Sequence, residues 1–175
     1  MCYDDDESNC AKYGRLYFYS AAVDSAGIWS KDGEGCGWRY SETTCSLTYP
    51  VRGICPEGSH LPDTTEWKDL LGLSEFKDAS YTPFTNFMAK NTSNDTWNKA
   101  AKDLYGFSML PAGYGEKTST GPSFSEIEKG ANFACSDKNH LIRVSQNGGR
   151  GASDDWTYLA SWNERLFSIR CVMDK

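Results

Sequence analysis

Two cysteine–histidine units are the residues of this sequence whose types and spacing come closest to metal chemistry. His60 follows Cys55, and His140 follows Cys135, each after four intervening residues. Thiolate and imidazole groups are the usual ligands of structural zinc, but this spacing does not match the close cysteine pairs of such sites, and no second close pair supports it. We therefore predict no metal site here, and we interpret His60 as a hydrogen-bonded packing residue.

Cys135 is the candidate for nucleophilic chemistry. A catalytic thiol needs a base and a lowered pKa, and His140 is the nearest base in the sequence, with Asp137 and Asp154 as groups that could orient it. The competing interpretation is a buried, unreactive free cysteine, which is common in folded proteins. We favour this second interpretation and predict no catalytic residue.

Paired carboxylates offer little support for acid–base catalysis. Asp154 and Asp155, or Glu126 and Glu128, could serve as such pairs. Nothing in their spacing makes two carboxyl groups converge on one substrate. We therefore interpret most of these side chains as solvated loop charges.

The seven cysteines argue for an oxidising compartment. They are Cys2, Cys10, Cys36, Cys45, Cys55, Cys135 and Cys171. The first four fall into two close pairs, Cys2 with Cys10 and Cys36 with Cys45, and both pairs enclose polar, turn-rich residues that suit short disulfides. Three cysteines remain, so at least one is unpaired or pairs with another chain.

Length and charge exclude several classes of protein. The chain of 175 residues is long enough for one domain with its own core, and we predict a single domain over residues 1–175. A net charge of −6, with an acidic cluster at residues 4–7, would repel a phosphate backbone and argues against a nucleic-acid partner. No stretch approaches the roughly 20 apolar residues of a membrane-spanning helix.

Sequence patterns predict two helices. Asp63 is a good N-cap with Glu66 three residues later, and Trp67, Leu70 and Leu71 recur at helical spacing before Gly72. A second helix is predicted over residues 94–104, with Trp97, Ala100, Ala101 and Leu104 on one face.

The rest of the chain predicts short strands and long loops. Residues 1–14 are acidic and loop-like, residues 16–19 form a strand followed by a short helix, and residues 29–54 form a long loop. A β-rich segment with a Pro-Ala-Gly turn begins at Tyr105.

Three strands are predicted in the C-terminal third, over residues 140–145, 155–161 and 166–172. The last strand alternates, so that Phe167, Ile169 and Cys171 share one face, and we expect Cys171 to point into the core.

Four motifs in order resemble one family. The strings "YGRLYFYSAAVDSAGIW", "CPEGSHLPDTTEW", "YGFSMLPAGY" and "FSIRCVMD" are similar to the Fibrobacter succinogenes major paralogous domain, which occurs in exported and surface proteins of Fibrobacter and Bacteroidetes. The resemblance covers most of the chain. It implies an α+β domain with a C-type-lectin-like fold: two helices, short antiparallel strands and long loops, stapled by disulfides. Such domains are distantly akin to formylglycine-generating enzymes and to variable proteins of diversity-generating retroelements.

The resemblance also implies a third disulfide. In the family pattern, the cysteine before the first proline pairs with the one in the closing strand, which corresponds to Cys55 and Cys171 and leaves Cys135 unpaired. Closing so long a loop would remove about 4 to 5 kcal/mol of unfolded-chain entropy. The chain departs from the family at Ser59, where a Trp is usual, and at Phe133, where "FACSD" replaces a Trp-Ser-Ser element. It also lacks the usual opening motif, so we expect the family's N-terminal strand region to be missing.

The C-terminal stretch "GGRGASDDWTYLASWNER" supplies the candidate binding surface, because its aromatic and polar side chains give contact area at low entropic cost. The predicted ligand-binding residues are Arg143, Asp155, Trp156, Tyr158, Trp162, Asn163 and Arg165. The competing interpretation is that Trp156, Tyr158 and Ala160 share one face and pack inward as core. In the retroelement-diversified relatives, ligand binding concentrates in this region.

The expected function is recognition. The sequence predicts a non-catalytic domain, extracellular or on the bacterial cell surface, which binds a carbohydrate, a peptide or a surface protein through its C-terminal strands and loops. The alternative is a formylglycine-generating-type or other thiol-dependent enzyme, which would need a converging pair of free cysteines. No cofactor is predicted, but calcium stays open, because lectin-like folds often bind it through loop oxygens.

Overall fold

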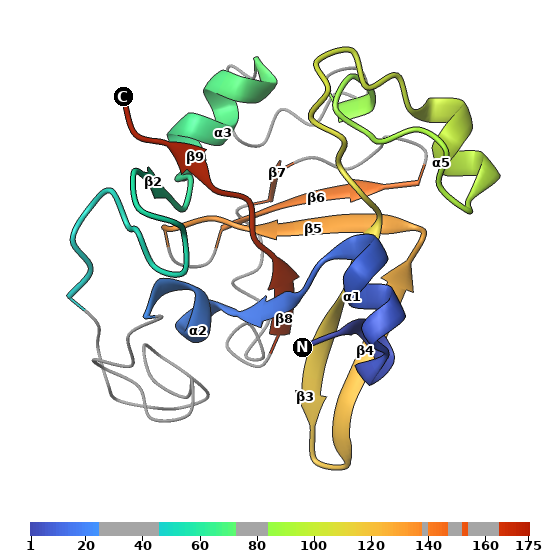
Figure 1. The fold of residues 1–175 in the computed structure, drawn as a ribbon, viewed down its shortest axis with the longest axis horizontal. Helices are drawn as coiled ribbons and strands as arrows, with labels where there is room; N and C mark the ends of the chain where they lie inside the picture. The colour runs from blue at the N-terminus through green and yellow to red at the C-terminus, as the bar shows by residue number, and fades with distance from the viewer. Residues whose placement is uncertain (25–45, 73–83, 138–139, 147–151, 154–164) are drawn as a thin grey trace.

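A computed structural model describes residues 1–24, 46–72, 84–137, 140–146, 152–153 and 165–175 (Figure 1). In this part of the chain, a mixed sheet of seven strands has the order β1-β8-β3-β5-β6-β7, and β4 pairs with β3 outside that path. The strands are β1 (Leu16–Phe18), β3 (Ala112–Thr118), β4 (Gly121–Ile127), β5 (Gly130–Ala134), β6 (Leu141–Ser145), β7 (Ala152–Ser153) and β8 (Arg165–Ser168). The sheet is antiparallel except where β5 runs parallel to β3 and to β8. An α+β fold is therefore observed.

A second, smaller sheet joins two distant segments. Strand β2 (Ser59–His60) pairs antiparallel with β9 (Val172–Met173). The helical elements are η1 (Tyr3–Asp5), α1 (Glu7–Tyr13), α2 (Tyr19–Val23), α3 (Thr64–Leu71) and α5 (Asp95–Ala100). Figure 1 shows β3 and β4 as a long hairpin that projects away from β5 and β6. The β2–β9 pair places the end of the chain beside the start of α3.

The main core lies between the helices α3 and α5 and the strands β5 and β6. Trp67 and Trp97 are fully buried there, together with Phe84, Met88 and Ile142. A second cluster packs α2 against the segment that leads into β2, and Cys55 belongs to it. The short helices are thus held mainly by the apolar residues that they bury.

The helix α3 confirms the predicted capping box. The Asp63 side chain accepts a hydrogen bond from the Glu66 backbone N–H at 2.9 Å, and the Glu66 side chain accepts one from the Asp63 N–H at 3.1 Å. Gly72 ends the helix in the left-handed region at φ 66°. One part of the prediction is wrong, because Leu70 does not share the buried face and is 45% exposed.

The second helix is shorter than predicted. Asn94 caps it through a 2.9 Å bond from the Trp97 N–H, and α5 ends at Ala100. The chain then turns away, because the N–H groups of Lys102 and Leu104 donate to backbone carbonyls of residues 85 and 86. Leu104 is consequently 63% exposed and not on the buried face.

The acidic N-terminal segment is helical, which corrects the prediction of a loop. Asp6 caps α1 by accepting a bond from the Ser8 N–H at 2.8 Å, and Gly14 ends the helix. Cys2 and Cys10 form the predicted disulfide across this segment. The helix α1 lacks an apolar periodicity, and its N-cap and the disulfide stabilise it instead.

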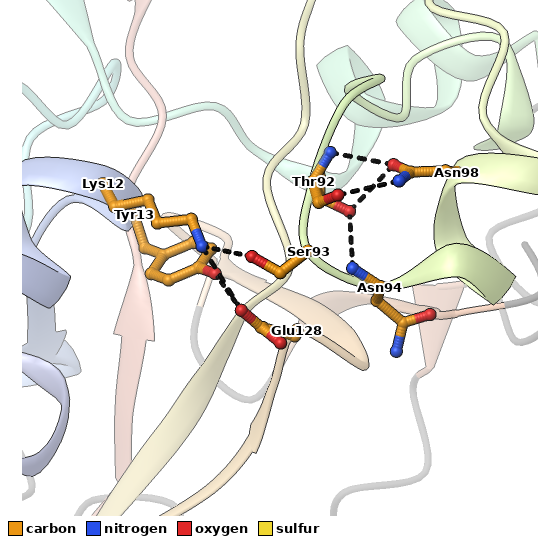
Figure 2. Close-up of polar contacts among 7 residues, drawn as sticks. All are labelled: Lys12, Tyr13, Thr92, Ser93, Asn94, Asn98 and Glu128. Carbon is orange, nitrogen blue, oxygen red and sulfur yellow. Dashed lines mark hydrogen bonds and ion pairs between the residues drawn. The ribbon is translucent and has the colours of Figure 1, made fainter.

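Side chains tie α1 to two other parts of the fold (Figure 2). Lys12 Nζ lies 2.6 Å from Ser93 Oγ and 3.3 Å from a Glu128 oxygen, and the Tyr13 hydroxyl donates to the same Glu128 oxygen at 2.8 Å. Nearby, Thr92 before α5 hydrogen-bonds with Asn98 of α5. The N-terminal helix is thus fixed to the turn between β4 and β5.

The β-rich segment begins later than predicted, at Ala112, and its Pro-Ala-Gly sequence is not a turn. Gly113 lies inside β3 at φ 68°, where a Cβ would meet the Ser125 carbonyl oxygen at 2.3 Å. The hairpin turn falls between β3 and β4 instead. Close approach of two strands therefore explains this glycine.

The predicted strand over residues 140–145 is confirmed as β6, but the closing strand is split. The chain leaves the main sheet after Ser168 and re-forms a strand only at Val172. Cys171 lies between the two strands and is exposed, so the expectation that it points into the core is wrong. It nevertheless bonds to the buried Cys55, as the family resemblance implied. The predicted strand over 155–161 and the Cys36–Cys45 pair lie outside the described residues.

Candidate functional site

The predicted binding surface is described at two of its seven positions. Arg143 on β6 donates a hydrogen bond to the Glu126 side chain of β4. Arg165 at the start of β8 lies 3.5 Å from a Glu116 oxygen and packs its guanidinium 5.1 Å from the centre of the Tyr114 ring. Both cations therefore interact with side chains of other strands of the sheet. Asp155, Trp156, Tyr158, Trp162 and Asn163 lie outside the described residues.

A groove of about 870 Å³ lies elsewhere, at the C-terminal end of α3. Its walls include Leu70, Phe87 and Tyr105, with Arg170 and Cys171 on the side of the C-terminal segment. A volume of this order is typical of small-ligand sites, which range over roughly 300–1,000 Å³. Four separate segments of the chain thus form one concave surface.

A smaller cavity of about 180 Å³ adjoins the groove. Its walls are nearly all apolar, with Pro62, Trp67 and Val172 around it. Leu70 and Arg170 line both spaces. Trp67 is buried, and its indole N–H has no acceptor among the residues that the structure describes.

A chain of aromatic rings holds the groove wall in place. Tyr105 packs on Phe87 with ring centres 5.1 Å apart, Phe87 meets Phe107 edge-on at 5.7 Å, and Phe107 meets Trp67 at 6.1 Å. Trp67 is buried, whereas Tyr105 is 68% exposed. The Phe87–Phe107 and Phe107–Trp67 pairs are edge-to-face, which favours a fixed ring orientation, and Tyr105 packs on Phe87 at a tilt at the exposed end of this chain.

Arg170 is the cation of this site. Its guanidinium lies 4.5 Å from the centre of the Phe107 ring and donates a hydrogen bond to the Phe107 carbonyl oxygen. A guanidinium has five N–H donors in a rigid plane, so donors remain for a ligand. No carboxylate of the described residues forms an ion pair with it.

Two interactions fix the segment that carries Arg170. The disulfide between Cys55 and Cys171 joins the residue after Arg170 to the loop before β2. His60 then contacts Asp174 at 2.5 Å through Nδ1 and Glu66 at 2.9 Å through Nε2. Burial alone would lower the pKa of His60, but the hydrogen bonds to the two carboxylates outweigh it and raise that pKa above its usual value. His60 therefore bridges α3 and the C-terminus, and its two carboxylate partners favour the protonated ring.

The thiol of Cys135 is poorly placed for chemistry. Cys135 is 1% exposed within the main core, and burial, with smaller effects from Asp137 and Asp63, raises its pKa well above the usual value. The His140 ring lies 3.1 Å from Asp137, and Cys135 reaches His140 only through a backbone hydrogen bond. A nucleophilic role would need a thiolate, which this environment disfavours.

The other candidate chemistries are not assembled in the described residues. Cys55 is committed to a disulfide and is not free to ligate a metal. Glu126 and Glu128 bind different partners, Arg143 and Tyr13, rather than a common substrate position. Over the described ranges, no group of three or more histidine, cysteine or acidic side chains could hold a metal ion. Whether calcium binds through loop oxygens stays open.

Sequence reasoning missed the groove, although part of its signal was visible. Leu70 was assigned to the buried face of its helix, and Phe107 to a strand. Arg170 lies in the predicted closing strand, but nothing in the alternation of that strand pointed to Phe107 as its neighbour. The visible signal was the cluster of Tyr105 and Phe107 around a glycine, which is typical of an aromatic loop.

Comparison with known proteins gives one result. A family model, the Fibrobacter succinogenes major domain, matches residues 1–173. No curated protein and no solved structure shows a significant match. Among the helices that the structure describes, none has the length and apolar character needed to cross a bilayer.

Proposed function

The chain belongs to the Fibrobacter succinogenes major domain family, and on that premise we propose that it is a non-catalytic recognition domain of an exported or cell-surface protein. Its ligand is a carbohydrate, a peptide or a surface protein. The observation that carries the proposal is the groove lined by Tyr105, Phe107 and Arg170, which combines exposed aromatic surface with a cation that has no ion-pair partner among the described residues.

The residue types of the groove support recognition. Tyrosine and arginine are enriched among the side chains that dominate binding energies, because they combine large apolar area with hydrogen-bond donors. Tyr105 is held by Phe87, and Arg170 is held by Phe107, so both side chains lose little freedom when a ligand binds. The groove is thus organised before a ligand arrives.

The covalent frame supports an extracellular or bacterial cell-surface location. Disulfides between Cys2 and Cys10 and between Cys55 and Cys171 persist in oxidising compartments and are rare in the cytosol. The second disulfide fixes the residue next to Arg170. The same bond that suits an exported protein therefore also shapes the proposed site.

We further propose that the α+β fold is C-type-lectin-like. The resemblance of the four sequence motifs supports this assignment, as does the antiparallel pairing of β1 with β8, which joins the beginning of the chain to its end. In this proposal, Arg170 to Val172 and the predicted patch around Trp156 both belong to the C-terminal region through which the domain binds its ligand.

The competing enzymatic function has less support. Chemistry of the formylglycine-generating type would need a converging pair of free thiols. Cys135 is the one free cysteine among the described residues, and it is buried. The core position of Cys135 is better explained by packing.

A binding screen tests the proposal. The purified protein is applied to glycan arrays, insoluble polysaccharides and surface-protein extracts, and hits are repeated with Tyr105→Ala and Arg170→Gln. We expect each substitution to weaken binding by about tenfold or more, as for residues that dominate an interface. Trp156→Ala and Trp162→Ala probe the patch predicted from the sequence. If only these two variants lose binding, recognition stands but the groove is not its site.

A further inference from the structure

We infer that the small cavity and the groove together form a peptide-binding site, in which the cavity takes one aromatic or branched aliphatic side chain and Arg170 takes the carboxylate of an adjacent acidic residue. This inference deepens the proposed recognition function and rests on it. It selects one ligand class, an extended peptide segment, from those that the proposed function allows.

The size of the cavity sets the first requirement on the ligand. A dry cavity of about 150 Å³ holds one benzene ring, and the cavity beside Trp67 measures about 180 Å³. It therefore accommodates one ring or one branched aliphatic side chain. The neighbouring groove of about 870 Å³ then holds the chain on either side of that anchor.

The chemistry of the walls excludes a sugar from the cavity. Glu66 and Arg170 reach its edge, but the remaining walls present almost only carbon, from Pro62, Trp67, Leu70, Phe107, Cys171 and Val172. A sugar carries hydroxyl groups around its ring, and the few polar groups of this lining cannot replace the hydration that all of these hydroxyls would lose. A hydrocarbon side chain gains from the same burial, because its apolar surface leaves water.

Charge sets the second requirement. Arg170 lies where the cavity and the groove meet, and no carboxylate of the described residues pairs with it. A ligand carboxylate at this position forms charge-assisted hydrogen bonds with a guanidinium that Phe107 already holds in place. Asp69, which also lines the groove, disfavours a second acidic residue. The ligand is thus an apolar anchor beside a single acidic residue.

An acidic side chain fits this position better than a chain terminus. The groove is several times larger than the cavity and extends from Leu70 past Tyr105. A chain that ended at Arg170 would leave much of this surface unused. A continuing chain covers it and brings further contacts with Tyr105 and Asn86.

Four capped tetrapeptides test the inference directly. Acetyl-Gly-Phe-Asp-Gly-amide is compared with versions in which Phe is replaced by Ala, in which Asp is replaced by Asn, or in which the order is reversed to Asp-Phe. Binding is measured by NMR titration of the ¹⁵N-labelled protein, with the indole N–H of Trp67 as the local reporter. We expect the Ala and Asn versions each to bind about tenfold more weakly. Equal affinity for all four peptides would overturn the inference.

Two exposed leucines provide a matched pair of variants. Leu70→Glu places a carboxylate in the wall shared by the cavity and the groove, whereas Leu104→Glu makes the same change at a leucine that lines neither space. Both side chains are largely exposed, so we expect both variants to keep the wild-type melting temperature. Leu70→Glu should lose about tenfold or more in affinity, and Leu104→Glu should bind as the wild type does. Equal losses in both variants would contradict the assignment of the site.

Arg170→Gln tests whether the guanidinium charge selects the carboxylate of the ligand. This variant should bind the Asp and Asn peptides equally, because the selective cation is gone. A variant that still prefers Asp would show that another group selects the carboxylate.

The recognition proposal and the peptide inference can be refuted separately. If a glycan from the binding screen requires Leu70 and Arg170 while no tetrapeptide binds, recognition at the groove stands and the peptide inference falls. If no glycan, surface protein or tetrapeptide binds, both fall.

Discussion

His60 shows how one charged side chain holds the C-terminal segment beside α3. Its two ring nitrogens contact Asp174 and Glu66, so both carry protons when the imidazole is charged. The hydrogen bonds to these carboxylates raise the pKa of His60 in the folded protein, against the effect of burial. Folding therefore stabilises the protonated form of His60 relative to the neutral form. In the unfolded chain its pKa is about 6.5.

This linkage predicts a stability that depends on pH. Its contribution is complete below about pH 6.5 and is lost as the pH rises through the higher folded pKa of His60. Urea unfolding should therefore give a higher midpoint near pH 6 than near pH 8.5. His60→Gln should remove this part of the difference. His140→Gln is the matched control, since the sequence has two histidines, and it should retain the difference.

Cys135 leads to a prediction about reactivity. Because its thiol is buried and its pKa is raised by burial, alkylation by iodoacetamide at neutral pH should be negligible in the native protein and complete after unfolding in denaturant. Mass spectrometry without reduction should then find links 2–10 and 55–171, with 36–45 as the link predicted from the sequence. Rapid labelling of native Cys135 would reopen the thiol-enzyme alternative.

At the scale of elements, α3 shows what the sequence can predict. A capping box and a terminal glycine act within one turn of the helix, so Asp63 and Gly72 define both ends without tertiary information. The helix α1 was missed for the opposite reason. Its stability depends on the Cys2–Cys10 bond and on the contacts of Tyr13 with Glu128, a residue far along the chain.

The groove could not be predicted either, because it also depends on contacts between residues far apart in the sequence. Leu70, Tyr105 and Arg170 come from three distant segments, and their meeting depends on where the chain goes after α5 and after β8. The hydrogen bonds of Lys102 and Leu104 to residues 85 and 86 determine the first path. The split of the closing strand determines the second, and it breaks the alternation from which Cys171 was placed in the core.

The cap of α3 gives a prediction for a single element. Asp63→Ala removes the acceptor for the Glu66 N–H and should lower the free energy of unfolding by about 0.5 to 2 kcal/mol. Thr65→Ala is the control, because Thr65 is exposed in the same helical turn and should change stability by less than about 0.5 kcal/mol. Chemical denaturation monitored by circular dichroism measures both. A loss no larger in Asp63→Ala than in Thr65→Ala would show that the cap contributes little.

At the scale of the whole molecule, the two described disulfides act over different lengths of chain. Cys2 and Cys10 are 8 residues apart, whereas Cys55 and Cys171 are 116 residues apart. The long link joins the loop before β2 to the C-terminal segment, where β9 completes the small sheet and Arg170 enters the groove. The same bond therefore restricts the unfolded chain and positions the proposed binding site.

Removal of each disulfide should separate these two roles. On the chain-entropy model, the loss of the 55–171 link costs about 4 to 5 kcal/mol and the loss of the 2–10 link about 2 to 3 kcal/mol. We therefore expect the Cys55→Ser/Cys171→Ser double variant to unfold at lower denaturant than Cys2→Ser/Cys10→Ser. Under conditions in which both variants remain folded, only the first should also bind the Phe-Asp tetrapeptide more weakly, because it releases the segment that holds Arg170. If both variants bind the peptide as the wild type does, the ion pairs of His60 with Glu66 and Asp174 and the β2–β9 pairing suffice to hold the groove.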